Sequence, residues 1–132
     1  YGIRFAYHNH AYSFEKMDGI YPQDVLMQNT NPDTVDYQLD IYWVVAAGED
    51  PVEWMKKHPG RFVSGHVKDL DNSGEEPEST VLGTGTIDFP SVLRIARENG
   101  MKHFIVEQEA YTNTTPLDAV KANADFMKDL RL

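Results

Sequence analysis

The sequence has no cysteine, no long apolar run and few positive charges. Without cysteine, a disulfide framework, a thiolate zinc site and a cysteine nucleophile are excluded, and we expect a reducing, cytoplasmic setting. The longest apolar run, Ile41–Ala47, is too short to cross a bilayer, so no membrane contact is expected. Lys and Arg number 12 against 21 Asp and Glu, a formal charge of −9 that argues against a nucleic-acid partner.

The length of 132 residues suits one domain, and no linker or low-complexity stretch divides it, so we expect residues 1–132 to form a single unit. A strand-like pattern starts at Tyr1, with neither an initiator Met nor a signal-peptide layout. We therefore expect either a piece of a longer protein or a chain that starts at a domain edge.

Strand-like and helix-like segments alternate along the chain. The expected strands are Ile3–His10, Val35–Val45, Arg61–Val67 and His103–Glu109. The expected helices are Pro22–Gln28, Pro51–His58 after the N-cap Asp50, a helix capped by Asp88 that ends at Asn99-Gly100, and one opened by Thr115-Pro116 whose apolar face is Leu117, Val120, Ala124, Met127 and Leu130. The polar segment Asp71–Thr86 is expected to be a long loop.

Four strand–helix units in succession predict an α/β fold with parallel strands and right-handed crossovers. A doubly wound open sheet is the first competitor, and it should show a glycine-rich phosphate turn directly after a strand. The cluster Gly83-Thr84-Gly85 lies in the long loop before a helix and does not match that turn. A segment of a barrel, with helices outside the strands, is therefore favoured.

Each expected strand has one mostly apolar face and one face that carries a His or a carboxylate near its C-terminal end. In a barrel the second face points inward, and enzymes of this architecture hold their active sites at that rim. His8, Asp40, His66 and Glu107 should converge there, although each alone could be a structural residue. Two imidazoles and two carboxylates suit a divalent cation such as Mn²⁺, Co²⁺ or Zn²⁺.

Five motifs at and near these residues resemble the xylose-isomerase-like TIM barrel superfamily, which includes sugar phosphate isomerases and epimerases, inosose dehydratases and AP endonuclease family 2. They are Tyr7-His8-Asn9-His10, Leu39-Asp40-Ile41-Tyr42-Trp43, Gly65-His66-Val67-Lys68-Asp69, the run Leu82–Phe89, and Val106-Glu107-Gln108-Glu109. The resemblance covers the whole chain as strands five to eight. It implies the C-terminal (βα)4 half of a TIM barrel, completed by dimerisation or by an N-terminal half that is missing.

In that family the metal ligands from strands five to eight are Glu, Asp, His and Glu. The resemblance places Asp40, His66 and Glu107 at the last three positions, whereas His8 stands where a Glu is usual. His10, on the same face, is the alternative ligand. Because epimerases of the family exchange a proton between two glutamates, the loss of one points toward the dehydratase-like and keto-sugar branch.

The chemistry expected is proton abstraction next to a sugar carbonyl through a metal-stabilised enediolate. Glu107 or Glu109 is the expected base, and His8 or His10 the acid–base partner. Lys68 would stabilise negative charge, unless it is a surface lysine. Tyr42 and Trp43 would form an apolar wall for a small-molecule sugar, with core packing as the alternative.

Four parallel strands leave two open edges, so we expect two copies to associate and complete an eight-stranded barrel. The expected function is a metal-dependent sugar or sugar phosphate isomerase or epimerase, with a dehydratase or lyase acting on a keto-sugar or inosose as the alternative. An endonuclease-like phosphodiesterase is disfavoured by the charge of −9. A half-barrel that binds metal or assembles without catalysing anything is the alternative of another class.

Overall fold

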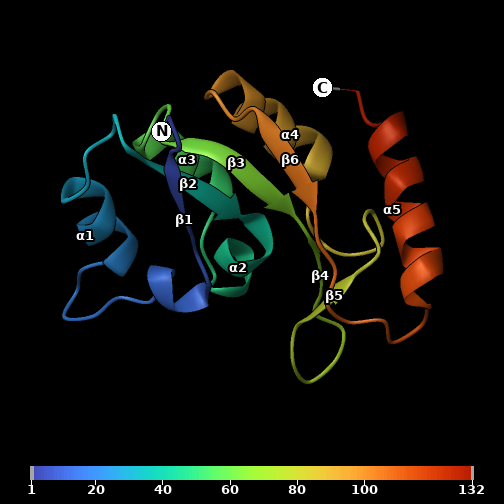
Figure 1. The fold of residues 1–132 in the computed structure, drawn as a ribbon. Helices are drawn as coiled ribbons and strands as arrows, with labels where there is room; N and C mark the ends of the chain where they lie inside the picture. Colours follow the sequence, from blue (N-terminus) through green and yellow to red (C-terminus); the bar gives the residue numbers. More distant parts are fainter. Residues whose placement is uncertain (1, 132) are drawn as a thin grey trace.

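The computed structural model describes residues 2–131 and contains one four-stranded parallel sheet, with the strand order β1-β2-β3-β6 (Figure 1). Its strands are β1 (Phe5–His8), β2 (Val35–Asp40), β3 (Phe62–Val67) and β6 (His103–Val106). All three pairings are parallel, so the four C-terminal strand ends share one edge of the sheet. The expected α/β half-barrel is confirmed.

The helices follow the strands in chain order. They are the short 3-10 helix η1 (Ala11–Phe14), α1 (Pro22–Gln28), α2 (Ile41–Ala46), α3 (Pro51–Lys57), α4 (Phe89–Glu98) and α5 (Pro116–Asp129). Figure 1 shows α3 and α4 on one side of the sheet, where buried apolar residues such as Leu39, Val67 and Leu93 form the core. Within residues 2–131, no helix has the length and apolar character that a bilayer crossing requires.

Three helix starts follow the capping rules that the sequence displays. The side chains of Asp50, Asp88 and Thr115 accept hydrogen bonds from backbone N–H groups in the first turns of α3, α4 and α5, and a proline stands in each first turn. The carboxylates or hydroxyls thereby satisfy donors that have no partner within the helix. The starts of these helices are therefore set locally, as the sequence predicted.

The expected strand Val35–Val45 is wrong in its second half, because β2 ends at Asp40 and α2 begins at Ile41. Oδ1 of Asp40 accepts a hydrogen bond from the backbone N–H of Trp43 at 3.2 Å and so caps α2. A short apolar run does not distinguish a buried helix from a buried strand by its periodicity. The side-chain cap of Asp40 makes the run after it helical, and α2 therefore begins directly at the end of β2.

The expected loop Asp71–Thr86 contains a hairpin instead. Strand β4 (Asp69–Asp71) pairs antiparallel with β5 (Glu78–Thr80). The strands are only three residues each, so they give almost no periodic signal in the sequence.

Buried Asp69 organises the segment that follows the hairpin. Its Oδ2 accepts hydrogen bonds from the backbone N–H groups of Gly83 (2.8 Å) and Gly85 (3.0 Å), and its Oδ1 accepts from Leu70 and Ile87. These bonds give the oxygens of the buried carboxyl group backbone donors as partners, as a buried polar group requires. The Gly-Thr-Gly run is therefore a carboxylate-binding turn and not a phosphate site.

The expected apolar face of α5 is also wrong for its first half. Leu117 is 80% exposed and Val120 is 63% exposed, whereas Ala119 and Asn123 are buried. Strand β6 is an edge strand of the sheet, and its Ile105 and Val106 are 45% and 38% exposed. Leu117 and Val120 thus belong to a surface that the four strands alone do not cover, whereas Phe126 and Met127 in the second half of α5, and Leu130 at its C-cap, pack against the core.

We predict that Gly85→Ala destabilises the fold, because an added Cβ would lie 2.4 Å from Oδ1 of Asp69 and 2.5 Å from the carbonyl oxygen of Leu70. Overpacking of this kind costs about 1–3 kcal/mol. Gly74→Ala is the matched control, since its Cβ would meet nothing nearer than 3.7 Å. Urea unfolding measures both variants, and equal stability of the two would contradict the role given to Asp69.

Candidate metal centre

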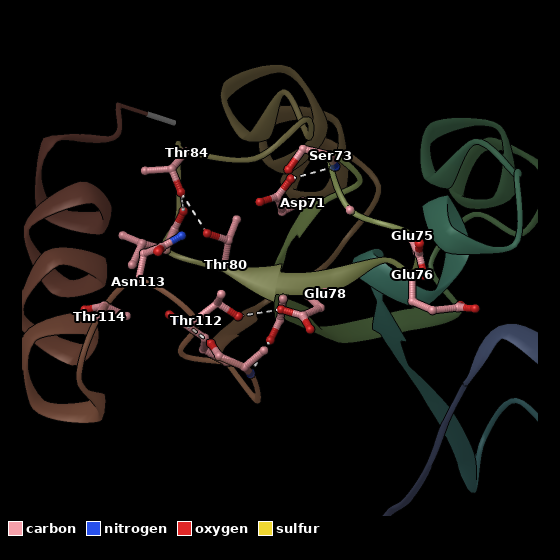
Figure 2. A pocket seen from close by; sticks show the side chains of 15 residues that line it. Asp71, Ser73, Glu75, Glu76, Glu78, Thr80, Thr84, Thr112, Asn113 and Thr114 are labelled. Carbon is pink, nitrogen blue, oxygen red and sulfur yellow. Dashed lines mark hydrogen bonds between the residues drawn. The ribbon is translucent and has the colours of Figure 1, made fainter.

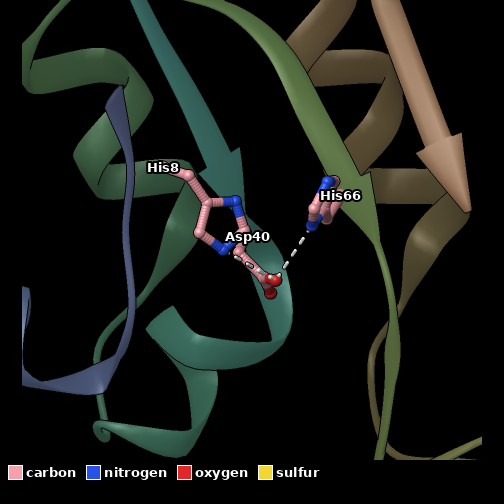
Figure 3. Close-up of side chains that lie close together, drawn as sticks. All are labelled: His8, Asp40 and His66. Carbon is pink, nitrogen blue, oxygen red and sulfur yellow. Dashed lines mark hydrogen bonds and ion pairs between the residues drawn. The ribbon is translucent and has the colours of Figure 1, made fainter. Parts of the chain in front are cut away.

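His8, Asp40 and His66 meet at the C-terminal edge of the sheet (Figure 3). Asp40 is the last residue of β2 and lies directly opposite His66 of β3, while His8 ends β1. Oδ2 of the fully buried Asp40 lies 3.6 Å from Nε2 of His8 and 3.3 Å from Nδ1 of His66. One possible ligand atom from each of the three residues lies within 4.8 Å of the other two, which is the spacing of a shared cation.

Glu107 joins this cluster from the residue directly after β6. Its Oε2 lies 3.0 Å from Nδ1 of His66, and its side chain is 35% exposed. Of the four expected ligands, His8 and His66 contact Asp40, and Glu107 contacts His66. The structure thus groups the possible ligand atoms of His8, Asp40 and His66, and Glu107 touches this group through His66 and is the most exposed of the four.

The electrostatics of the cluster favour a positive charge. The hydrogen bond with Asp40, together with the negative charges of Glu107 and Asp40, outweighs burial and raises the pKa of His66 above its ordinary value. Two carboxylates around an imidazole therefore stabilise a proton at the place where a cation would bind. Oδ1 of Asp40 is engaged by the helix cap and Oδ2 faces the imidazoles, so the residues present fit a divalent ion with nitrogen and oxygen ligands.

Lys68 is fully buried, so the alternative of a surface lysine is wrong. Its Nζ binds the carboxylate of Glu109 and lies 3.6 Å from Oε2 of Glu107. The same nitrogen lies 4.7 Å from the ring centre of Tyr42 and 5.1 Å from that of Trp43. The expected catalytic groups Lys68, Glu107 and Glu109 therefore form one ion cluster beside His66.

The hairpin helps to hold Glu109. Oγ of Ser79, a buried residue of β5, accepts hydrogen bonds from the backbone N–H groups of Glu109 and Ala110, both at 2.8 Å. The segment that the sequence suggested to be a loop thus fixes the backbone that carries one of the candidate bases.

His10 lies beside the cluster and not within it. Its ring is 5.0 Å from that of His8, 5.4 Å from that of Trp43 and stacked on Tyr12 at 5.8 Å, with the side chain exposed. The geometry places His8 against Asp40 and leaves His10 free to face a substrate. Its role remains a prediction.

Tyr42 and Trp43 lie in the first turn of α2 and differ in exposure. Tyr42 is buried and donates a hydrogen bond from its hydroxyl to the carbonyl oxygen of Pro77 at 2.9 Å. Trp43 is half-buried between His10 and Lys68. Trp43 is therefore better placed than Tyr42 to contact a sugar, which remains a prediction for both.

Sequence reasoning missed Asn9 and Gln38. The side chain of buried Asn9 donates to the carbonyl oxygen of Asp40 at 3.2 Å and accepts from its backbone N–H at 2.9 Å. Oε1 of Gln38 lies 3.1 Å from Nδ1 of His8. The signal for Gln38 was its place two residues before Asp40 on the same face of β2, and Asn9 was marked only by its place between two histidines.

A hollow of about 840 Å³ lies between the β4–β5 hairpin and the loop before α5 (Figure 2). Its walls carry acids and hydroxyls, and Oγ1 of Thr112 donates a hydrogen bond to Glu78 across it at 2.6 Å. None of His8, Asp40, His66 and Glu107 lines this hollow. Its lining includes Ser79, which holds the backbone of Glu109, and Gln108, which lies between Glu107 and Glu109 in the chain.

The family described as xylose isomerase-like TIM barrel matches residues 1–130 of this chain. The chain belongs to that family. Its four strands and the rim cluster are consistent with this membership, and the expected family is confirmed.

Among its relatives are proteins named inosose dehydratase. That of Clostridium botulinum (strain Alaska E43 / Type E3) is 29% identical over 146 residues, covering 97% of this chain and 48% of the relative. That of Geobacillus thermodenitrificans is 30% identical over 125 residues, covering 82% and 41%.

A solved structure of a sugar phosphate isomerase/epimerase from Parabacteroides distasonis superposes with a TM-score of 0.83 at 31% identity, covering 96% of this chain and 45% of that one. The chain therefore spans less than half the length of these relatives. Members of the family are sugar-modifying enzymes.

We predict that Asp40→Asn weakens divalent-metal binding by at least the roughly 10–100-fold that loss of an outer partner costs a metal site. Asn remains a good N-cap, so α2 should persist. Asp50→Asn is the matched control, because it makes the same change at the cap of α3 outside the cluster. Titration calorimetry with Mn²⁺, Co²⁺ and Zn²⁺ measures the affinities, and equal affinity of both variants would contradict the site.

Proposed function

We propose that this chain carries the metal-binding half of a sugar isomerase or epimerase active site, in which a proton next to a carbonyl is removed. The observation that carries the proposal is the meeting of His8, Asp40 and His66 at the strand ends, with Glu107 against His66. These residues would hold Mn²⁺, Co²⁺ or Zn²⁺. Such an ion, when bound, polarises a carbonyl and makes the adjacent C–H more acidic.

Glu107 is the better placed of the two candidate bases. Its carboxylate lies beside His66 and is partly open to solvent, so it can face both the centre and a substrate. Glu109 is bound directly to the buried ammonium of Lys68, which lies 3.6 Å from Glu107. The contact of Glu107 with His66, one of the three possible ligands, therefore favours Glu107 as the base.

An uncharged sugar suits the rim better than a sugar phosphate. Among residues 2–131, the lysine at the strand ends is Lys68, and two carboxylates surround it. The neighbouring hollow adds Asp71, Glu75, Glu76 and Glu78, which would repel a phosphate. Trp43 and exposed His10 offer ring faces against which the C–H groups of a sugar can pack.

A dehydratase acting on a keto-sugar or inosose is the second candidate. It is favoured by His8 at the position where two-base epimerases carry a Glu, and by relatives named inosose dehydratase. Elimination needs one base for the C–H and one acid for the departing hydroxyl. Glu107 and His10 would supply these two functions.

The test is proton exchange in D2O with keto-sugars and inosose, in the presence of Mn²⁺ and followed by NMR. We expect the chain to exchange the proton next to the carbonyl, and Glu107→Gln to abolish exchange while Glu98→Gln, on the exposed end of α4, retains it. An epimeric product would identify the first candidate, and loss of water seen by mass spectrometry the second. Bound metal without exchange or turnover would instead support a non-catalytic module.

We further propose that two copies close an eight-stranded barrel. A two-fold axis along the barrel would set β1 of each copy beside β6 of the other, keep the eight strands parallel and gather their C-terminal ends on one rim. Phe5 beside one open edge is 63% exposed and Ile105 beside the other is 45% exposed, so closure would bury apolar surface at both. In a longer chain, four further strands would cover the same edges.

Light scattering measures this assembly directly. We expect a mass of two chains, and Ile105→Lys should return it to that of one chain, because a buried unpaired ammonium opposes closure. Val25→Lys, on an exposed position of α1, is the control and should leave the mass unchanged. A well-dispersed wild-type monomer would reject the two-copy barrel.

A further inference from the structure

The two ring nitrogens of His8 face different partners. Nδ1 lies 3.1 Å from Oε1 of Gln38, its direct neighbour in the β1–β2 register, and Nε2 lies 3.6 Å from Oδ2 of Asp40. The side chains of His8 and Gln38 are half-buried, so water competes less for these contacts than it would at an open surface. The arrangement bears on which nitrogen of His8 carries the proton.

A neutral imidazole carries one N–H, and each of these two neighbours can accept it. The carboxylate of Asp40 would draw the proton to Nε2, and the amide oxygen of Gln38 would draw it to Nδ1. The first distance exceeds that of a normal N–H···O hydrogen bond and the second does not. The proton therefore belongs on Nδ1, which leaves the lone pair of Nε2 pointing at the space beside Asp40.

We propose that Gln38 is a positioning residue that holds His8 in the Nδ1–H form, so that Nε2 is ready to bind a cation. This inference rests on the proposed metal centre. A carboxylate presents two equivalent oxygens and needs no such selection, whereas an imidazole binds a metal only through the nitrogen that lacks a proton. With a histidine at position 8, Gln38 can select the ring nitrogen that carries the proton. A glutamate at position 8 would need no such selection.

The test compares two substitutions whose order of effect separates positioning from packing. Gln38→Met keeps the length of the side chain and removes the acceptor, so the affinity for Zn²⁺ or Mn²⁺ should fall about 10–100-fold. Gln38→Glu keeps an oxygen acceptor and should bind at least as tightly as the wild type. If Gln38 only fills space, Met is tolerated and the added charge of Glu is harmful, and this reversed order would overturn the proposal.

Two controls accompany the titrations. Gln28→Met makes the same change on the exposed end of α1 and should leave the affinity unchanged. The Co²⁺-loaded forms should give the same visible spectrum for wild type and Gln38→Glu, and an altered one for Gln38→Met, because the geometry of the ligands differs.

A measurement without metal separates this inference from the proposed function. Long-range ¹H–¹⁵N NMR distinguishes protonated from unprotonated ring nitrogens, and His8→Gln assigns the signals of His8. At a pH where the imidazoles are neutral, His8 should be in the Nδ1–H form in the wild type and shift toward Nε2–H in Gln38→Met. An Nε2–H form in the wild type, or no change in the variant, overturns the role of Gln38, whereas failure to bind metal with the expected tautomer overturns the metal centre alone.

Discussion

The buried carboxylate of Asp40 is the constraint on which the site and the local fold depend. Oδ1 caps α2, Oδ2 faces His8 and His66, and the backbone on either side of the side chain is held by Asn9. A buried charge is tolerated only where donors or cations surround it. Asp40 therefore ends β2 and caps α2. Its buried carboxylate also needs the two imidazoles, or an ion bound between them, as partners. Fold and chemistry are coupled at a single residue.

Charge balance extends this constraint outward along the rim. Glu107 and Glu109 lie against one buried ammonium, that of Lys68, and Asp40 lies against His66, so the three carboxylates outnumber the one ammonium and the cluster favours a further positive charge. The hydrogen bond with Asp40 and the negative charges of Glu107 and Asp40 outweigh burial and raise the pKa of His66, in keeping with that excess of negative charge. The β4–β5 hairpin supports this cluster, because Ser79 binds the backbone of Glu109 and Asp69 binds the turn that follows the hairpin.

Local signals account for what the sequence could predict. Capping residues set the starts of α3, α4 and α5, and strand phase placed His8, Asp40 and His66 on one edge. The end of β2 could not be predicted, because Asp40 serves as both strand residue and cap. The exposure of Leu117 and Val120 could not be predicted either. The spacing of apolar residues shows which face of a helix is apolar, but not whether four strands are enough to bury it. The sequence put Gln38 on the same face as Asp40, but only the strand register showed that it lies beside His8.

An imidazole at position 8 changes what such a centre can do. Replacing a carboxylate by His8 removes one negative charge and one strong base from the rim, and nitrogen ligands shift preference from hard cations toward borderline ones. A proton exchange between two faces of a substrate needs two bases of similar strength. Here Glu107 lies against His66, while the imidazole of His8 lies against Gln38 and Asp40. Removal of a proton by one carboxylate, with departure of a hydroxyl assisted by a nearby acid such as His10, needs only the groups that remain. The histidine at position 8 is therefore the feature that speaks for the second candidate, a dehydratase, whereas the proposed metal centre itself would serve either reaction.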